Sequence, residues 1–264
     1  MDFKKIEKIS TGSYDLNTWL YGGYEKGIIT MIAGPPGSGK TNMAVLAACS
    51  QAKKGNKVLF IDTEGGFSTD RVKQIVGENF EEVLKNILLL EPRSFDEQKK
   101  FFVNLNEKLK QEQISLIVVD GVAMLYRLEL GDARIKEGER FRETGNKEDN
   151  ERGREVDENV KNINIEVAKQ MKLFAEISKN QNLPIIITNQ VYAGFQSEED
   201  WKNGLEREVN IVGGDLFQYW SKCIIQLKNE HGKRKAILIK HRSLPEKELN
   251  FEIKNEGIVK KRWI

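Results

Sequence analysis

The stretch IITMIAGPPGSGKTN, residues 28–42, decides the fold. It begins with an apolar, β-type run at 28–33, turns through glycines and prolines, and then enters a helical pattern. The segment GPPGSGKT fits the pattern GxxxxGK[ST] of a phosphate-binding loop, which needs a strand before it and a helix after it. The backbone N–H groups of such a loop bind phosphate because they converge at the positive end of the helix. The stretch therefore predicts an α/β fold with a nucleotide site after its first core strand.

The residue types in this loop predict how a nucleotide is held. Lys40 can reach the β- and γ-phosphate oxygens, and the Thr41 hydroxyl can coordinate Mg²⁺. We therefore expect a purine nucleoside triphosphate and Mg²⁺ at this loop. The residues expected to bind the nucleotide are Gly34, Pro35, Pro36, Gly37, Ser38, Gly39, Lys40, Thr41 and Asn42.

Two further apolar stretches end in carboxylates that can serve the same site. Residues 114–120, ISLIVVD, end in Asp120, which can hold the metal ion together with Thr41. Residues 60–66, FIDTEGG, carry Glu64, which can act as a base or orient a water molecule in hydrolysis. Because the carboxyl ends of parallel strands meet at one edge of a sheet, both carboxylates are expected beside the phosphate-binding loop.

Short apolar runs alternate with helical patterns along most of the chain, which is typical of βαβ units. Strands are predicted at 28–33, 58–62, 87–90, 116–120 and 185–189. Helices are predicted at 42–54, 71–85, 95–112 and 156–179. After Gly214 the pattern changes to a hairpin, 221–228 and 235–241, followed by a strand at 249–253. We expect a single α/β domain over 1–264, with a twisted, mainly parallel sheet flanked by helices and a C-terminal antiparallel hairpin.

Two segments do not have the pattern of packed structure. Residues 127–161 carry nine Lys or Arg and eleven Asp or Glu, which predicts either a solvated, mobile excursion or an extended helix. Residues 191–214 contain four glycines directly after a predicted strand. Both segments follow the carboxyl ends of predicted parallel strands, the edge where open α/β sheets bind ligands.

Composition excludes several classes of protein. The 42 Lys and Arg nearly balance the 40 Asp and Glu, so the formal charge of +2 excludes a protein that coats nucleic acid through bulk charge. The apolar runs are too short to span a membrane, and the N-terminus has no signal-peptide pattern. Cys49 and Cys223 lie in apolar stretches, which predicts buried thiols and a cytoplasmic protein. The two histidines, His231 in a predicted turn and His241, are too few for a histidine metal cluster.

Taken together, these residues resemble the RecA-type recombinase superfamily and, within it, the archaeal and eukaryotic recombinase branch. The resemblance covers roughly residues 9–258 and strings several motifs in the expected order. The matching residues are Ser10-Thr11-Gly12-Ser13 with Leu16 and Gly22-Gly23, then GPPGSGKT, Asp62-Thr63-Glu64-Gly65 with Phe67 and Arg71, Val118-Val119-Asp120, Leu125-Tyr126-Arg127, Ile187-Thr188-Asn189-Gln190-Val191, Gly213-Gly214, and Arg242-Ser243-Leu244-Pro245-Glu246.

The resemblance implies a RecA-like ATPase core and specific roles for several residues. Glu64 looks like the catalytic glutamate, Arg71 like the arginine that packs on the adenine, and Gln190 like the glutamine that senses the γ-phosphate and relays to DNA. Segments 127–161 and 191–214 match the two DNA-binding loops of the family. Binding to DNA is therefore expected, with single strands as the expected form.

The sequence differs from the strand-exchange members of the superfamily in two ways, which indicate the branch it resembles most. Strand-exchange members carry an N-terminal helix-hairpin-helix domain and a Phe-x-x-Ala motif, whereas here the core begins near residue 9 and Phe3-Lys4-Lys5-Ile6 does not fit. Autonomous filament formation is therefore not expected. Lys240-His241-Arg242 forms a KxR motif that RadB, KaiC and DnaB-like proteins share and that is inferred to reach a neighbour's nucleotide. On a strand Lys240 and Arg242 would share one face and could address one anion; the alternative is that both are solvated surface charges.

This combination looks most like the archaeal RadB family. It implies an ATP-binding, DNA-binding accessory protein of homologous recombination and DNA repair, with weak DNA-dependent ATPase activity. The main archaeal recombinase is the expected partner, and the KxR motif implies self-association. Two alternatives stay open: a module in which bound ATP only fixes a conformation that partners recognise, and a KaiC- or DnaB-like oligomeric ATPase. The basic, Trp-containing tail at 254–264 fits single-strand binding and a packed strand equally well.

Overall fold

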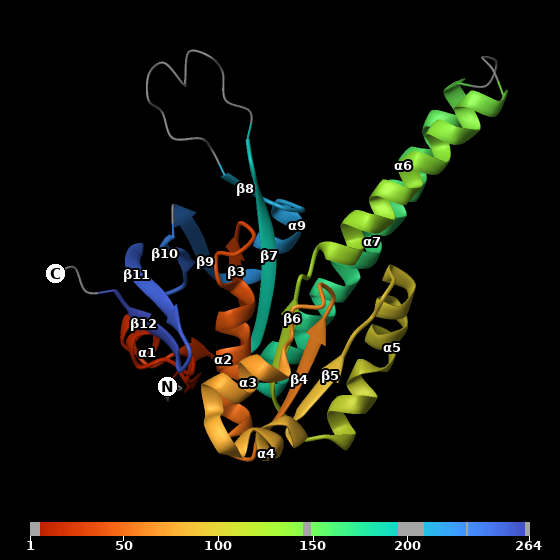
Figure 1. Ribbon diagram of the computed structural model, residues 1–264. Coiled ribbons are helices and arrows are strands. Elements are labelled where there is room, and N and C mark those ends of the chain that lie inside the picture. Colours follow the sequence, from red (N-terminus) through yellow and green to blue (C-terminus); the bar gives the residue numbers. More distant parts are fainter. Residues whose placement is uncertain (1–5, 145–148, 195–208, 231, 262–264) are drawn as a thin grey trace, which may run out of the picture.

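A computed structural model describes residues 6–144, 149–194, 209–230 and 232–261 (Figure 1). Within these residues ten strands form one sheet, and the short strands β1 and β2 pair separately. Across the large sheet the hydrogen-bonded order is β12-β11-β10-β9-β3-β7-β6-β4-β5, and β8 pairs with β7.

The bounds of the elements follow. The strands are β1 (Lys8–Ile9), β2 (Tyr24–Glu25), β3 (Ile29–Gly34), β4 (Lys57–Asp62), β5 (Ile87–Leu90), β6 (Ile114–Asp120), β7 (Ile185–Ala193), β8 (Val209–Ile211), β9 (Ser221–Glu230), β10 (Lys233–His241), β11 (Lys247–Lys254) and β12 (Gly257–Lys260). The helices are α1 (Tyr14–Trp19), α2 (Lys40–Ala52), α3 (Thr69–Val76), α4 (Phe80–Lys85), α5 (Phe95–Gln111), α6 (Met124–Thr144), α7 (Asp149–Gln181) and α9 (Asp215–Gln218), with a 3₁₀ turn at Gly77–Asn79.

The middle of the sheet is parallel and buried. β3 lies between β7 and β9, and every residue of β3 is buried. Burial on both faces explains why its sequence is a mostly apolar run rather than an alternation of apolar and polar residues. From β9 to β12 the neighbours are antiparallel. The predicted α/β class, the mainly parallel sheet and the antiparallel C-terminal strands are confirmed.

Successive side chains of the central strands enter two hydrophobic cores on opposite faces of the sheet. Met31 on β3 lies in the core formed with α5, α7 and α9, whereas Ile32 lies in the core formed with α1, α2, α3 and α4. The two cores pack against both faces of the central strands and so determine their register. The carboxyl ends of these strands therefore lie at the edge of the sheet beside the start of α2 (Figure 1). Cys49 and Cys223 are buried in the second of these cores as free thiols, as expected.

The helix predicted at 71–85 is broken. α3 ends at Val76, Gly77 follows with φ of 73°, and a 3₁₀ turn leads into α4. The cause is Gly77 itself, because a glycine at positive φ terminates a helix at its C-terminus. The apolar periodicity continues through this break, so it gave no sign of it.

The charged segment 127–161 lies largely in two helices. α6 and α7 contact each other and project together away from the sheet (Figure 1). The helical alternative is therefore the one observed, apart from residues 145–148, which lie outside the described part. Of the segment 191–214, residues 195–208 lie outside the described part, and β7 and β8 form an antiparallel pair on either side of them. Over the described residues, no helix is both long and apolar enough to cross a membrane.

Candidate functional site

The loop between β3 and α2 curls around the side chain of Lys40. Lys40 Nζ donates to the carbonyl oxygens of Gly34 at 3.0 Å and of Pro35 at 3.1 Å. Gly39 has φ of 108°, and a Cβ there would lie 2.9 Å from Ile253 Cδ1, so both backbone conformation and space require glycine. Burial lowers the pKa of Lys40, and the carboxylates of Glu64 and Asp120 oppose that shift. The loop thus holds a buried cation at the N-terminus of α2.

Asp120 lies at the end of β6, beside Thr41 at the start of α2. Thr188 on the neighbouring strand β7 donates its hydroxyl to Asp120 Oδ1 at 2.5 Å and accepts the N–H of Gly121 at 2.8 Å. The other oxygen, Oδ2, is buried without a hydrogen-bond partner in the described residues. Burial raises the pKa of Asp120; the hydroxyls of Thr188 and Thr41 oppose the shift, and the charges of Asp62 and Glu64 add to it.

Glu64 and Gln190 meet above the phosphate-binding loop. Gln190 Nε2, at the level where β7 leaves the core, donates to Glu64 Oε1 at 3.0 Å. Asp62 shapes the turn that carries Glu64, because its Oδ1 accepts the N–H groups of Glu64 and Gly65 and its Oδ2 accepts that of Phe67. A Cβ at Gly121 would lie 2.5 Å from Glu64 Cγ, so the glycine leaves room for this side chain.

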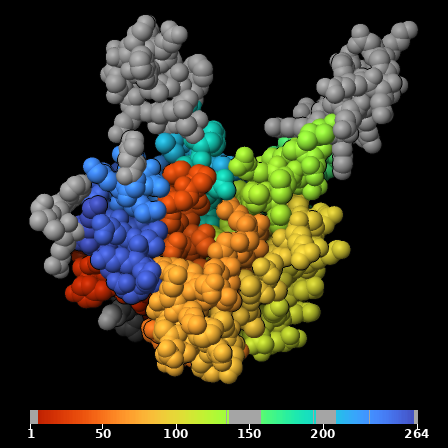
Figure 2. All heavy atoms as spheres, viewed as in Figure 1, coloured from red at the N-terminus to blue at the C-terminus, as the bar shows by residue number. Residues whose placement is uncertain are grey.

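A cleft of about 510 Å³ joins these groups. Figure 2 shows the orange-red atoms of α2 and the loop before it exposed between the blue C-terminal strands and the orange segment of α3. The residues that line the cleft are Pro36, Gly37, Gly39, Lys40, Thr41, Asn42, Glu64, Gln190, Arg234 and Ile253. The structure therefore gathers the predicted loop, the glutamate and the glutamine around one cavity.

Arg71 lies beside the cleft and is held from three sides. Its Nε donates to Asn42 Oδ1 at 2.7 Å, and its terminal nitrogens donate to the carbonyl oxygens of Lys254 and Asn255 at 2.9 and 3.0 Å. Burial lowers the pKa of Arg71. The guanidinium thus ties α2 and α3 to the turn between β11 and β12, next to Ile253, and its stacking on a base stays a prediction.

The residues present fit a Mg²⁺-bound nucleoside triphosphate. A Cβ built on Gly66 would lie 3.3 Å from both Thr41 Oγ1 and Asp120 Oδ2, so these two oxygens converge on one point. Both are hard oxygen ligands of the kind that Mg²⁺ prefers. Ser38 Oγ, beneath the loop, is also buried without a partner in the described residues. Unpaired buried oxygens and a buried lysine at a helix N-terminus are the groups that a metal ion and phosphates would satisfy.

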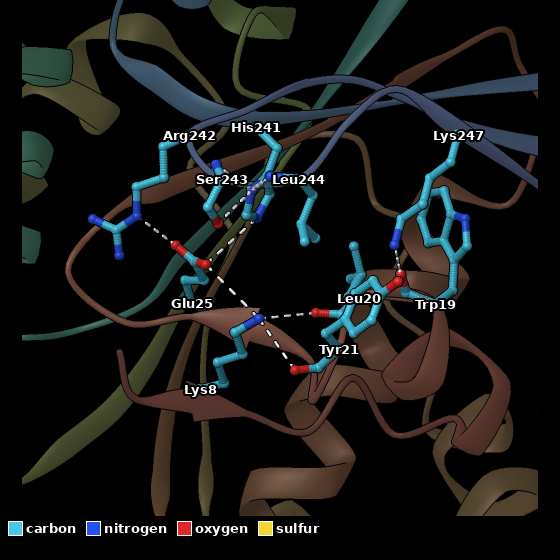
Figure 3. A network of polar contacts seen from close by, with 10 residues as sticks. All are labelled: Lys8, Trp19, Leu20, Tyr21, Glu25, His241, Arg242, Ser243, Leu244 and Lys247. Carbon is cyan, nitrogen blue, oxygen red and sulfur yellow. Dashed lines mark hydrogen bonds and ion pairs between the residues drawn. The ribbon is translucent and has the colours of Figure 1, made fainter. Parts of the chain in front are cut away.

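Lys240 and Arg242 lie apart from this cleft and from each other's contacts. Lys240 Nζ donates to the carbonyl oxygen of Gln218 at 2.8 Å, whereas Arg242 Nε donates to Glu25 Oε2 at 2.6 Å (Figure 3). The register of β10 against β9 shifts between Leu238 and Lys240, and the strand ends at His241. The expectation that both cations share one strand face does not hold, because β10 ends at His241 and Arg242 lies beyond the strand, where alternation no longer applies.

Four residues of the site were not predicted from the sequence to take part in it. Arg234 and Ile253 line the cleft from β10 and β11, and Arg234 Nε lies 3.4 Å from the carbonyl oxygen of Gly37. Only the antiparallel pairing of the C-terminal strands could have placed them. Thr188 and Asp62 had a usable signal, since each is a polar residue at the carboxyl end of an otherwise apolar strand. Arg127 of the expected first DNA segment lies near Glu64 and Gln190 in a neighbouring small pocket.

Comparison with known proteins agrees with these features. The sequence pattern of the Rad51 family matches residues 3–141 and 152–261. The DNA repair and recombination protein RadB of Methanobrevibacter smithii is 37% identical over 263 residues, or 98% of each chain. RadB of Methanocaldococcus jannaschii is 38% identical over 239 residues, covering 90% of this chain and 96% of that protein. The crystal structure of a RadB recombinase has a TM-score of 0.70 at 28% identity and covers 96% of this chain and 100% of that one.

The first prediction concerns Lys40. Lys40→Ala removes the buried cation while the loop backbone remains, and a hydrogen bond to a charged group contributes about 1.5–3 kcal/mol. ATP affinity, measured by calorimetric titration, should fall at least tenfold, on the order expected from that contribution. Lys53→Ala, at the exposed C-terminal end of the same helix, is the matched control and should bind ATP normally. Equal affinity of Lys40→Ala and the parent protein would contradict the assignment of the loop.

The second prediction concerns the buried carboxyl of Asp120. Its raised pKa means that the folded protein holds this proton more tightly than the unfolded chain, so stability is lost as pH rises through the folded-state pKa. Asp120→Asn removes the charge and keeps an oxygen for Thr188. At neutral pH and without nucleotide it should raise Tm by a few degrees, about 2–5 °C, and flatten this pH dependence. The same change should weaken Mg²⁺-dependent ATP binding. A lower Tm at neutral pH would show that the carboxylate stabilises the fold.

Proposed function

This chain belongs to the RadB proteins of the Rad51 family, and we propose that it is an ATP-binding and DNA-binding accessory protein of homologous recombination and DNA repair. In this proposal it hydrolyses ATP slowly when bound to single-stranded DNA and regulates the main recombinase of its cell. The observation that carries the proposal is the hydrogen bond between Gln190 and Glu64, which joins the nucleotide cleft to the strand that leads into segment 191–214.

The chain's own groups divide the chemistry among themselves. Lys40 and the loop 34–41 would bind the phosphates, and Thr41 and Asp120 would hold the metal ion. Bound Mg²⁺ supplies neutralisation of charge on the phosphate oxygens. Glu64 accepts a proton from, or orients, the attacking water. Arg71, bonded to Asn42 beside the cleft, would bind the base, and the contact of Gln190 with Glu64 would change when the phosphate beside Glu64 is lost.

Gln190 is well placed to pass such a change to DNA. Its carbonyl oxygen accepts the N–H of Val212 at 3.0 Å, and the next residue, Val191, pairs with Ile211. Both ends of the segment 191–214 are therefore tied to the residue that contacts Glu64. This arrangement supports a segment whose shape depends on the nucleotide, with the charged helices after Tyr126 as the second DNA contact. Arg127, Arg134 and Arg140 are the cations proposed to bind phosphate there, with the tail at 254–264 as a further contact.

Lys240 and Arg242 are proposed to act on the nucleotide of a neighbouring copy. Neither residue lines the cleft of its own chain, and both are exposed at the C-terminal end of β10. Cations supplied across an interface stabilise the charge that develops on phosphate during transfer. The proposal therefore includes head-to-tail self-association, in which each copy offers its β10 end to the next.

Steady-state ATPase assays with and without single-stranded DNA test the function. Turnover should require Mg²⁺, rise with DNA, and be lost in Glu64→Gln while ATP binding remains, because only the hydrolytic group is altered. Glu78→Gln, an exposed glutamate in the 3₁₀ turn, is the control. If the parent protein binds ATP without any turnover, a non-hydrolysing module is the better description. Closed hexamers on sizing with ATP would instead favour a KaiC-like ATPase.

A mixing experiment tests the action in trans. Arg242→Ala should lower turnover per protomer at high protein concentration and leave the ATP affinity of the dilute protein unchanged. Mixing it with Glu64→Gln should restore part of the activity, because one variant keeps the nucleotide site and the other keeps the cation. Arg93→Ala, another exposed arginine, should behave like the parent. Flat activity across dilution together with no restoration on mixing would make Lys240 and Arg242 surface charges.

A further inference from the structure

Glu25 is a buried carboxylate at the end of β2, outside the nucleotide cleft. Its side chain is 2% exposed, yet three basic side chains, those of Lys8, His241 and Arg242, approach it (Figure 3). Oε1 lies 3.8 Å from Lys8 Nζ and 3.6 Å from His241 Nε2, and Oε2 accepts the Nε–H of Arg242 at 2.6 Å. A charge this deeply buried is costly unless it is paired, and the short contact is the one to Arg242.

The contact uses one edge of the Arg242 guanidinium and leaves the other free. A guanidinium carries five N–H donors in a planar fork, and only the Nε–H is bonded in the described residues. The two terminal nitrogens point away from Glu25 (Figure 3), and the side chain is 43% exposed. An arginine anchored through Nε in this way presents a fixed, bidentate edge, which is the geometry that binds a phosphate.

The other two groups near Glu25, His241 and Lys8, face Oε1 and are held by hydrogen bonds of their own. His241 Nδ1 accepts the N–H groups of Ser243 and Leu244, both at 3.1 Å, so a neutral ring carries its proton on Nε2, toward Glu25. Burial lowers the pKa of His241; Glu25 opposes that shift, while Lys8, Arg242 and Lys247 add to it. Lys8 Nζ is itself bonded to the carbonyl oxygens of Leu20 and Tyr21. Among the described residues, Arg242 therefore makes the shortest contact with Glu25, and it is the only cation bonded to Oε2.

We propose that Glu25 is the positioning residue of Arg242: by accepting the Nε–H, it holds the guanidinium with its terminal nitrogens toward a phosphate bound by a second copy of this chain. The inference rests on the trans action proposed above. It adds Glu25 as the residue that fixes the orientation of the Arg242 guanidinium. A long, exposed arginine loses much rotamer freedom when it meets an anion, and an anchor that removes this freedom beforehand favours the bound arrangement.

The first test compares Glu25→Gln with Arg242→Ala in the full chain with ATP, Mg²⁺ and single-stranded DNA. Glu25→Gln should lower the kcat of the concentration-dependent turnover about three- to tenfold and leave the ATP affinity of the dilute protein unchanged. Mixing with Glu64→Gln should restore activity, and mixing with Arg242→Ala should not, because both lack the same contribution. The double variant Glu25→Gln/Arg242→Ala should be no slower than Arg242→Ala alone.

A spectroscopic readout separates positioning from a general structural effect. The Nε–H signal of Arg242, assigned by its loss in Arg242→Lys, should exchange slowly in the parent and rapidly in Glu25→Gln. Glu7→Gln is the matched control: Glu7 lies next to β1 and bonds Lys26 at 2.8 Å, and its change should leave exchange and turnover as in the parent. Arg242→Lys should be as slow as Arg242→Ala, because one ammonium cannot pair with Glu25 and also present a fork.

The outcomes distinguish the inference from the function on which it rests. If Arg242→Ala lowers turnover but Glu25→Gln does not, or if the two changes multiply in the double variant, the positioning role is wrong and the trans action stands. If Arg242→Ala has no effect, the trans action fails and the inference fails with it. If Glu25→Gln does not fold, Arg242→Lys decides: turnover equal to that of the parent overturns the proposal.

Discussion

The register of the central parallel strands determines the geometry of the candidate site. β4 and β6 pair Asp62 with Asp120, and β3 and β7 pair Gly34 with Gln190. Side chains alternate between the two faces of a sheet, so a slip of one residue would turn a carboxylate away from the cleft and bury it in a core. Apolar cores on both faces make such a slip unfavourable. The same packing that stabilises the sheet therefore brings the loop 34–41, Asp120 and Gln190 to one edge.

At that edge the protein buries two ionisable side chains, and burial disfavours the charged form of each. The pKa of Asp120 is raised and that of Lys40 is lowered, both mainly by burial. Each group is thus held in an environment that disfavours its ionised form, although a metal ion and phosphates need the ionised form. Groups of this kind mark functional sites more often than structural ones, because a purely structural position would favour a neutral residue. Asp62 shows the contrast: its oxygens accept three backbone N–H groups and leave little capacity for a ligand.

The sequence predicts the position of a residue well when that position follows from the strand that carries it. It predicts the position poorly when it depends on how that strand pairs with other strands. The residues from Gly34 to Thr41, with Glu64, Asp120 and Gln190, each follow an apolar strand, and the shared edge of a parallel sheet brings them together. Arg234 and Ile253 reach the cleft through the antiparallel register of β9, β10 and β11, which no local pattern specifies. The break at Gly77 was hidden by continuous apolar periodicity. Alternation failed for Lys240 and Arg242 because it assumes a continuous strand, and β10 ends at His241, between them.

The direction of β10 places its two ends at opposite edges of the sheet. β3 and β9 run parallel, and β10 runs back against them, so its first residues lie at the edge of the phosphate-binding loop, where Arg234 lines the cleft. Its last residues lie at the opposite edge, beside β2. At about 3.3 Å per residue, the eight steps from Arg234 to Arg242 cover roughly 26 Å, more than an arginine side chain can span. Arg242 therefore does not reach the cleft of its own chain, so the proposed action on a nucleotide requires a second copy. A head-to-tail contact satisfies this constraint, because it places the base of one sheet against the cleft edge of the next, and Glu25 at that base then acts where the copies meet.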